Sequence, residues 1–136
     1  MLKKQRSIKM RFTVEELCQG MIPTEKQKKN LEKLVEALNT LGSVYSDPVV
    51  VIRGLRSEMQ NEAVGGVPNS PHLTGEAVDL QDKDHKLSQF ILNNLVMLER
   101  AGLYMENPYY CVSKTTGNNW IHLQTRKASQ TVFKPY

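Results

Sequence analysis

The feature that most constrains the fold of this chain is a change in the spacing of its apolar residues. Between residues 24 and 41 they recur every three or four positions, which predicts an amphipathic helix with one buried face. Residues 49–52 (VVVI) form an unbroken β-branched run, too short for a helix, which predicts a buried strand. The same reasoning predicts helices over 14–19, 57–64 and 86–101 and strands over 77–80, 103–112 and 120–124.

These elements indicate an α+β fold, because helices dominate the first half of the chain and strands follow. The expected architecture is a small antiparallel sheet with helices packed on one side. A length of 136 residues fits one globular domain, which we place at residues 12–136. Residues 1–11, of which five are Lys or Arg, are expected to form a basic N-terminal tail.

The net charge of +4 would suit an anionic partner, and both nucleic acid and the bacterial cell wall are candidates. Much of the excess comes from residues 1–11 and 26–33, for which a frayed terminus and a solvated helix surface are the simpler explanation. No RNA-binding or helix-turn-helix signature occurs in the chain. We therefore expect no nucleic-acid partner, and we expect a monomer.

Cysteine content and hydropathy exclude two further classes of protein. The two cysteines, Cys18 and Cys111, form no CxxC motif, so neither a disulfide framework nor a thiolate zinc site is indicated, and both are expected to be buried thiols. The basic N-terminus is not followed by an apolar run of signal-peptide length, and no segment is long enough to span a bilayer. We expect synthesis in the cytoplasm without membrane insertion. A cell-wall substrate would then be reached through a lysis pore or on a virus particle.

Side chains that bind metal ions occur in two short segments. Residues 70–79 read SPHLTGEAVD, and residues 120–122 read WIH. Two histidines and one carboxylate are a ligand set that zinc takes in catalytic sites, where a fourth position stays open for water. His122 is expected on a strand whose residues alternate between the core and a cleft, while His72 and Asp79 lie in a loop and the strand that follows it. Spacing alone leaves open that His72 is simply a solvated loop histidine.

The stretch from Gly54 to Leu80, GLRSEMQNEAVGGVPNSPHLTGEAVDL, resembles the signature region of the zinc D-alanyl-D-alanine carboxypeptidase and L-alanyl-D-glutamate endopeptidase family. The family pattern is SxHxxGxAxD followed later by WxH, and GLRS is similar to its GYRS. The opening FTVEEL resembles the start of small phage and prophage members, so the likeness runs from Phe12 to about Gln124. Every fixed position of the pattern is met, by Ser70, His72, Gly75, Ala77, Asp79, Trp120 and His122.

The resemblance implies a fold like that of the hedgehog domain and the D-Ala-D-Ala peptidases, with a role for each motif residue. His72, Asp79 and His122 would bind zinc, which polarises the scissile carbonyl and lowers the pKa of its water. Gly75 would provide the turn that brings His72 beside Asp79. Arg56 would offer a guanidinium to the developing oxyanion or to a substrate carboxylate, with a surface ion pair as the alternative. The implied partners are peptidoglycan stem peptides.

One position departs from the family pattern. Members usually carry Glu or Asp three residues before the last zinc histidine, where it acts as the general base, and here that residue is Asn119. An amide hydrogen-bonds but does not take up a proton at neutral pH. Glu106, on the strand before the loop, is the best substitute, and Glu76 is the second. We expect Asn119 to contact the reacting water and Glu106 to accept its proton.

Asp82, Asp84 and His85 form a second group of candidate metal ligands. They directly precede the helix predicted over 86–101, where acidic residues commonly cap the first turn. We expect a solvated turn that caps this helix in preference to a second metal site.

Three functions from different classes remain open at this point. The first is an active zinc peptidase of peptidoglycan, acting as a carboxypeptidase or an endopeptidase, of the phage or prophage lysin type or carried on a virion. The second is a zinc-binding pseudoenzyme that binds wall peptides or serves in a virus particle, which Asn119 favours. A nucleic-acid-binding protein, suggested by charge alone, is the third.

Overall fold

The computed structural model of the chain describes residues 12–135, so the basic tail expected at residues 1–11 lies outside the described part. The helices are α1 (Val14–Cys18), α2 (Glu25–Gly42), α3 (Glu58–Ala63), α4 (Lys86–Leu92) and α5 (Leu95–Ala101). The strands are β1 (Val51–Arg53), β2 (Ala77–Gln81), β3 (Tyr104–Glu106), β4 (Trp120–Gln124) and β5 (Val132–Phe133). Short 3₁₀ turns lie at Pro71–Thr74, Lys83–His85 and Pro108–Tyr110.

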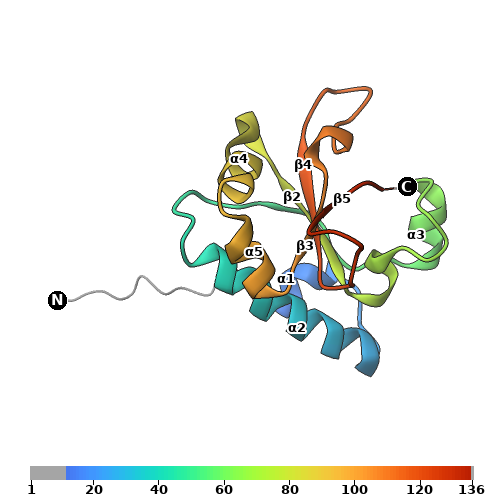
Figure 1. Cartoon of the computed structure of the whole chain (residues 1–136). Helices are drawn as coiled ribbons and strands as arrows, with labels where there is room; N and C mark the ends of the chain where they lie inside the picture. The colour runs from blue at the N-terminus through green and yellow to red at the C-terminus, as the bar shows by residue number, and fades with distance from the viewer. Residues whose placement is uncertain (1–11, 136) are drawn as a thin grey trace.

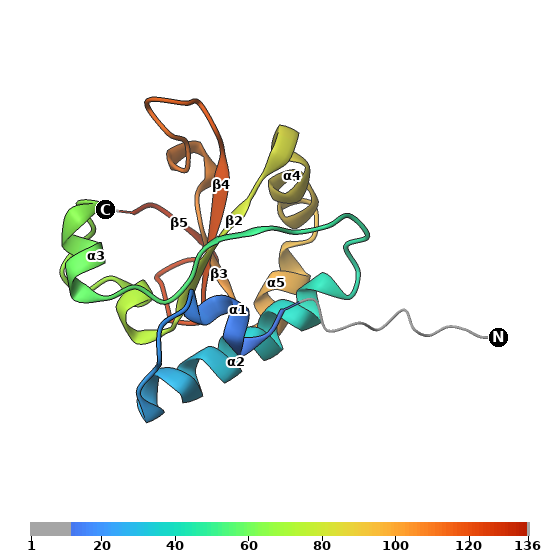
Figure 2. The ribbon, with the colours of Figure 1, turned by 180° about the vertical axis from the view of Figure 1, so that it is seen from behind.

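The strands form one sheet in the order β1-β2-β4-β3-β5. Neighbouring strands run antiparallel, except that β3 and β5 pair in parallel. α1, α2 and α5 lie together below the sheet in Figure 1, and the same layering is seen from behind in Figure 2. The predicted α+β fold is confirmed. The parallel strand β5 is an addition that the apolar pattern did not predict.

Side-chain alternation gives the sheet two different faces. Val78, Ile121 and Leu123 are completely buried in the hydrophobic core that the sheet shares with the helices. Burying an aliphatic side chain of this size contributes about 1.5–3 kcal/mol, so this face anchors the sheet. Asp79 and His122 directly adjoin these residues in β2 and β4 and therefore point to the opposite face. The polar side chains thus stand on strands that the core holds rigidly.

Thr24 followed by Gln27 in the sequence predicts a capping box at the start of α2, and the structure contains it. The Gln27 N–H donates to Thr24 Oγ1 (3.1 Å), and the Thr24 N–H donates to Gln27 Oε1 (2.9 Å). The apolar face of α2 is buried in the core, whereas its first turns hold the loop before β2. Gln27 Nε2 donates to the Leu73 carbonyl (3.0 Å), and Asn30 Nδ2 donates to the Thr74 carbonyl (2.9 Å). None of the described helices is long and apolar enough to cross a membrane.

The helix predicted over residues 86–101 is wrong as a single element, because α4 and α5 are separated at Asn93 and Asn94. The backbone of Asn94 leaves the helical region (φ −139°, ψ 43°), and its Nδ2 donates to the Phe90 carbonyl at 2.7 Å. An asparagine side chain offers the backbone an alternative hydrogen bond and so disfavours the interior of a helix. The break lets α5 turn and pack against α2.

The strand predicted over residues 103–112 is too long, since β3 ends at Glu106. Asn107 Oδ1 accepts a hydrogen bond from the Tyr109 N–H (3.0 Å) and starts a 3₁₀ turn with Pro108 in its first position. Proline has no N–H for a sheet and its φ suits the start of a helical turn, which explains the early end of the strand.

The strand predicted over residues 49–52 is shifted and only half buried, because Val49 and Val51 pack against the core whereas Val50 and Ile52 are exposed. β1 spans Val51–Arg53 at an edge of the sheet, where Val50 and Ile52 are 51% and 37% exposed. A β-branched run fits an edge strand as well as a central one, so sequence pattern could not distinguish them. The shift matters because it makes Arg53 part of the strand.

Gly75 ends the 3₁₀ turn Pro71–Thr74 in the left-handed region (φ 81°), as its place in the motif predicts. A Cβ at this position would also lie 2.9 Å from the Gln27 carbonyl oxygen and 3.0 Å from Leu31 Cγ on α2. Gly102 has a similar φ of 78°, but no atom would lie within 4 Å of its Cβ. Comparing the same substitution at the two glycines therefore separates the cost of a left-handed backbone from the cost of crowding against α2.

We expect Gly75→Ala to lower the free energy of unfolding by about 2–4 kcal/mol, because it combines a left-handed alanine with overpacking against α2. Gly102→Ala is the matched control, for which only the backbone cost of about 1–2 kcal/mol is expected. Urea unfolding followed by circular dichroism measures both. Equal losses in the two variants would show that the contact with α2 contributes nothing to the placement of this loop.

Candidate metal centre

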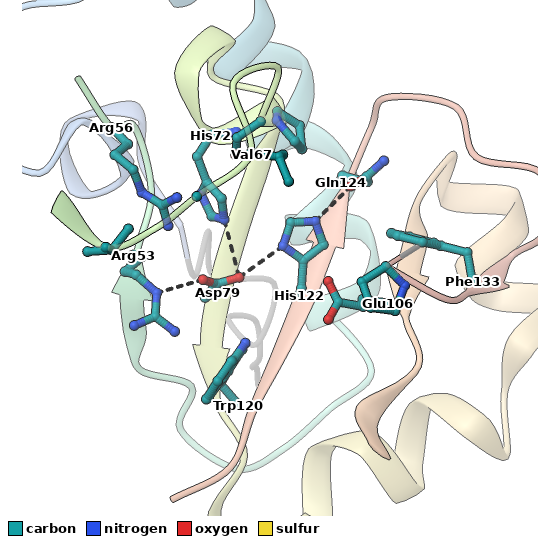
Figure 3. A pocket seen from close by; sticks show the side chains of 15 residues that line it. Arg53, Arg56, Val67, His72, Asp79, Glu106, Trp120, His122, Gln124 and Phe133 are labelled. Atoms are coloured by element: carbon teal, nitrogen blue, oxygen red, sulfur yellow. Dashed lines mark hydrogen bonds and ion pairs between the residues drawn. The ribbon is translucent and has the colours of Figure 1, made fainter. Parts of the chain in front are cut away.

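Three buried side chains from three separate segments meet on the polar face of the sheet. His72 lies in the turn Pro71–Thr74, Asp79 in β2 and His122 in β4, and none is more than 8% exposed. Asp79 Oδ1 lies 3.4 Å from His72 Nε2 and 3.0 Å from His122 Nδ1 (Figure 3). Candidate ligand atoms of the three residues all lie within 4.8 Å of one another.

The pairing of β2 with β4 places Asp79 directly opposite His122. Residues paired in this way in an antiparallel sheet have Cβ atoms about 4.5–5.5 Å apart, so short side chains can meet without distorting the backbone. His72 is brought to the same place by the turn, whose start is fixed by Ser70. The Ser70 hydroxyl accepts a hydrogen bond from the His72 N–H at 3.2 Å.

Each histidine ring is held by a partner on the side away from Asp79. His72 Nδ1 lies 2.9 Å from the Gly54 carbonyl oxygen, which only accepts hydrogen bonds, so Nδ1 carries the proton and Nε2 presents a lone pair. His122 Nε2 lies 2.7 Å from Gln124 Oε1, while Gln124 Nε2 donates to the Arg126 carbonyl (2.9 Å). His122 therefore presents the lone pair of Nδ1.

The arrangement fits a metal ion by its own chemistry. Two imidazole lone pairs and a carboxylate oxygen directed at one point repel one another unless a cation, either a proton or a metal ion, lies among them. Tetrahedral zinc with ligand bonds of about 2.0–2.1 Å would hold its ligand atoms about 3.3–3.4 Å apart. The two distances of 3.0 and 3.4 Å to Asp79 Oδ1 are close to that spacing.

The same geometry shifts the pKa values of the acidic and basic groups. Burial alone would raise the pKa of Asp79, but when a proton takes the place of a metal ion, the hydrogen bonds and positive charges of the protonated His122 and His72 outweigh burial and lower it. Burial alone would lower the pKa of His122, but the hydrogen bond and negative charge of Asp79 raise it. Asp79 is thus an ionised, ready ligand throughout the neutral range.

A cleft of about 400 Å³ opens above the three side chains. Arg56 and Glu106, two of the residues assigned catalytic roles from the sequence, both line it. They lie on opposite sides, with Arg56 on the side of His72 and Glu106 beside His122 (Figure 3). Asn119 is not among the lining residues.

Glu106 comes from the end of β3, on the strand next to β4. Met105 pairs with Leu123 on the core face, so Glu106 and His122, one step further on, share the face of the cleft. Cys111 Sγ donates to Glu106 Oε2 at 3.4 Å, and burial together with the negative charge of Glu106 raises the pKa of that thiol. Cys18 and Cys111 are both buried free thiols, as predicted.

Arg56 follows β1, and hydrogen bonds hold both its backbone and its guanidinium. Its N–H donates to the His72 carbonyl (3.1 Å), and its Nη1 donates to Asn61 Oδ1 (2.9 Å). Burial lowers the pKa of Arg56 and the charge of Asp79 opposes that effect, but a guanidinium remains protonated at neutral pH. Arg56 therefore keeps its charge inside the cleft.

Asn119 immediately precedes β4, and its backbone extends the pairing of the sheet. It forms a single β-bridge with Val112, and its carbonyl accepts a hydrogen bond from the Asp82 N–H (3.3 Å). Residues at odd separation in a strand face opposite sides, so the position three before His122 points away from the cleft unless the backbone bulges. The contact expected between Asn119 and the reacting water does not fit this placement.

The other acidic candidates also have structural roles. Glu76 accepts hydrogen bonds from Arg126 Nη2 (2.9 Å) and Arg126 Nε (3.2 Å), and it is not among the residues that line the cleft. Asp82 Oδ1 accepts hydrogen bonds from the Leu87 and Ser88 N–H groups and so caps α4, as predicted. The expectation that this turn is solvated is wrong for Asp82, which is 2% exposed.

Two residues of the site were missed by sequence reasoning. Gln124 stands two positions after His122, and strand alternation, which places both on one face, was the signal that could have found it. Arg53 donates from Nε to Asp79 Oδ2 at 2.7 Å. No local pattern identifies this pair, because the contact depends on the register between β1 and β2.

Comparison with known proteins identifies the family of the chain. The family model of peptidase M15 matches residues 6–124 of the chain. The chain belongs to the peptidase M15 family, which confirms the family expected from the motifs. No curated protein sequence matches the chain. Among solved structures, the chain is similar to the crystal structure of the L-Ala D-Glu endopeptidase ChiX of Serratia marcescens, with 25% sequence identity, coverage of 74% of this chain and 86% of that chain, and a TM-score of 0.47.

Arg126 follows β4, the strand that carries His122, and its hydrogen bonds connect this segment to the loop that carries His72. Besides Glu76, it donates to the Asn69 carbonyl (2.6 Å) and to Thr74 Oγ1 (3.1 Å). Burial alone would raise the pKa of Glu76, but hydrogen bonds from Thr74 and Arg126 and the charge of Arg126 lower it. The ionised form of Glu76 therefore stabilises the folded loop.

We expect Glu76→Gln to lower the free energy of unfolding by about 0.5–1 kcal/mol at neutral pH, because the amide keeps the hydrogen bonds but loses the charge. A carboxylate whose pKa is lowered by folding contributes stability above its unfolded pKa of about 4.3, and that contribution is lost as the pH falls through the folded pKa. The difference between wild type and variant should thus vanish in acid. Urea unfolding at several pH values measures it, and a difference independent of pH would contradict the ion pair.

Proposed function

We propose that this chain is a zinc-dependent peptidase that hydrolyses a peptide bond in the stem peptides or cross-links of peptidoglycan. The observation that carries the proposal is the convergence of His72 Nε2, Asp79 Oδ1 and His122 Nδ1 on one point beneath an open cleft, in a member of the peptidase M15 family. Two neutral imidazoles and one carboxylate suit zinc and leave a coordination position for water and substrate.

When bound, zinc would polarise the scissile carbonyl and make water nucleophilic at neutral pH. The remaining work falls to the side chains of the cleft. Glu106 lines the cleft but does not belong to the His72–Asp79–His122 group, so it is free to carry a proton. We assign it the role of general base, which takes the proton of the attacking water and passes it to the leaving amine. The hydrogen bond from Cys111 orients Glu106 without neutralising it.

Arg56 faces Glu106 across the metal-binding point (Figure 3). Its hydrogen bonds through Asn61 and the His72 carbonyl hold it in place, and a prepositioned cation lowers the energy of a developing oxyanion without reorganising. We assign it to the oxyanion or to a carboxylate of the substrate. Removing one such donor typically lowers kcat about 10²–10³-fold.

The choice of peptidoglycan as substrate rests on the family motifs and on charge. A net charge of +4 favours the anionic cell wall. We further propose a lysin-type role, in which the protein is made in the cytoplasm of a host cell and reaches the wall on release or on a virion. A pseudoenzyme was suggested by Asn119, but Asn119 does not line the cleft, so its amide is no evidence of lost activity.

Metal analysis combined with incubation on purified peptidoglycan tests the proposal. We expect one equivalent of zinc per chain, and we expect fragments that mass spectrometry assigns to cleavage of one type of peptide bond. Removing the zinc with a chelator should abolish cleavage, and adding zinc should restore it. His122→Ala, which deletes a ligand, is the control for adventitious zinc. Absence of cleavage by fully loaded protein on any wall peptide would exclude the enzymatic function.

A second test identifies the general base. Glu106→Gln should lower kcat about 10²–10⁴-fold with zinc content unchanged, because the amide keeps the shape but cannot carry the proton. Asn119→Glu, alone or together with Glu106→Gln, should not restore activity, since position 119 is outside the cleft. If Asn119→Glu raises cleavage instead, the base belongs at position 119 and the assignment of Glu106 is wrong.

A further inference from the structure

The side chain of Arg53 connects three adjacent strands of the sheet, and none of the roles assigned above belongs to this residue. It belongs to the edge strand β1, and its Nε donates to Asp79 Oδ2 on β2 at 2.7 Å. Its guanidinium carbon lies 5.0 Å from the centre of the Trp120 ring on β4. Figure 3 shows the guanidinium beside both the carboxylate of Asp79 and the indole of Trp120. A motif residue, Trp120, thus has a contact that zinc binding does not explain.

The backbone on both sides of Arg53 is fixed. Arg53 pairs with Asp79 in the β1–β2 ladder, next to an irregularity in the register between Val51 and Arg53. Gly54 follows, where a Cβ would clash with the Leu17 carbonyl oxygen, and the Leu55 N–H donates to that same oxygen (2.8 Å). The Arg53 side chain therefore starts from a defined position against α1.

Asp79 has two oxygens, and the structure gives them different partners. Oδ1 faces the two histidine nitrogens, whereas Oδ2 accepts the hydrogen bond from Arg53. A hydrogen bond between charged groups at this distance is among the stronger ones, and Asp79 is buried while the Arg53 side chain is 39% exposed. Arg53 holds Oδ2 on its own side, so Oδ1 is the oxygen that is directed toward the two histidines and a metal ion between them.

We propose that Arg53 is a positioning residue that restricts Asp79 to a single metal-binding oxygen, and that Trp120 holds Arg53 in this position. The inference rests on the proposed zinc function. A carboxylate that binds through one oxygen keeps a coordination position for water and substrate, whereas one that binds through both would fill it. Partners of this kind typically change metal affinity about 10- to 100-fold.

Two effects of Arg53 oppose each other. Its positive charge repels a bound cation, whereas its hydrogen bond orients the ligand. The side chain is partly exposed, so water screens the repulsion, while the bond to buried Asp79 Oδ2 is short. The orienting effect should therefore dominate. Arg56 provides the matched control, because it carries the same charge in the same cleft but bonds to Asn61 instead of Asp79.

The test compares zinc affinity, measured by competition with a chromophoric chelator, in the wild type, Arg53→Ala, Arg53→Lys, Trp120→Leu and Arg56→Gln. Arg53→Ala should weaken binding about 10- to 100-fold, and Trp120→Leu should weaken it less. Arg53→Lys should recover part of the loss, and Arg56→Gln should not weaken binding. In the cobalt-substituted proteins, Arg53→Ala should lower the visible absorption, because a second oxygen of Asp79 raises the coordination number.

The outcomes separate the inference from the proposed function. Suppose that the wild type binds zinc and that Arg53→Ala binds it equally or more tightly, with an unchanged cobalt spectrum. This result would overturn the role of Arg53 but not the proposed function. A wild-type chain that binds no zinc would overturn the proposed function and the inference with it. Circular dichroism of the metal-free variants checks folding. If Arg53→Ala fails to fold, Arg53→Lys and Trp120→Leu decide, and wild-type affinity in both would overturn the inference.

Discussion

The in-register pairing of β2 with β4 is the constraint on which the rest of the site depends. It sets Asp79 opposite His122, and it does so with the aliphatic neighbours Val78, Ile121 and Leu123 fully buried on the other face. A slip of one residue in either strand would turn the polar side chain of that strand into the core and expose its apolar ones, so the hydrophobic effect itself enforces the register. The candidate metal centre is thus stabilised by the same free energy that folds the domain.

The three candidate ligands are supported in different ways. The Gly54 carbonyl holds the His72 ring, Gln124 holds the His122 ring, and Arg53 occupies the second oxygen of Asp79. These partners come from β1, the residue after it, and β4, so the site is supported by the sheet and not by the loop alone. Orientation of this kind matters because a metal site loses affinity when its ligands must be ordered on binding.

The cleft also separates positive from negative side chains. Arg56 and Arg53 stand toward β1, and Glu106 stands on β3 beyond His122 (Figure 3). A cation near a developing oxyanion and a carboxylate near a transferable proton are the two complements that peptide hydrolysis needs beside a metal. Asn119, at the motif position where a base was expected, does not line the cleft, whereas Glu106 on the neighbouring strand β3 does.

Residue types and short spacings were enough to predict the features that local physics controls. The capping box of α2 followed from such patterns, whereas the left-handed Gly75 and the convergence of His72, Asp79 and His122 were expected from the resemblance to the family motif. Contacts between distant segments were not predictable in this way. The contact of Arg53 with Asp79 and the place of Asn119 outside the cleft both depend on strand registers that no local spacing encodes. Those registers follow from the burial of the whole apolar face, which is a property of the folded chain and not of any segment of it.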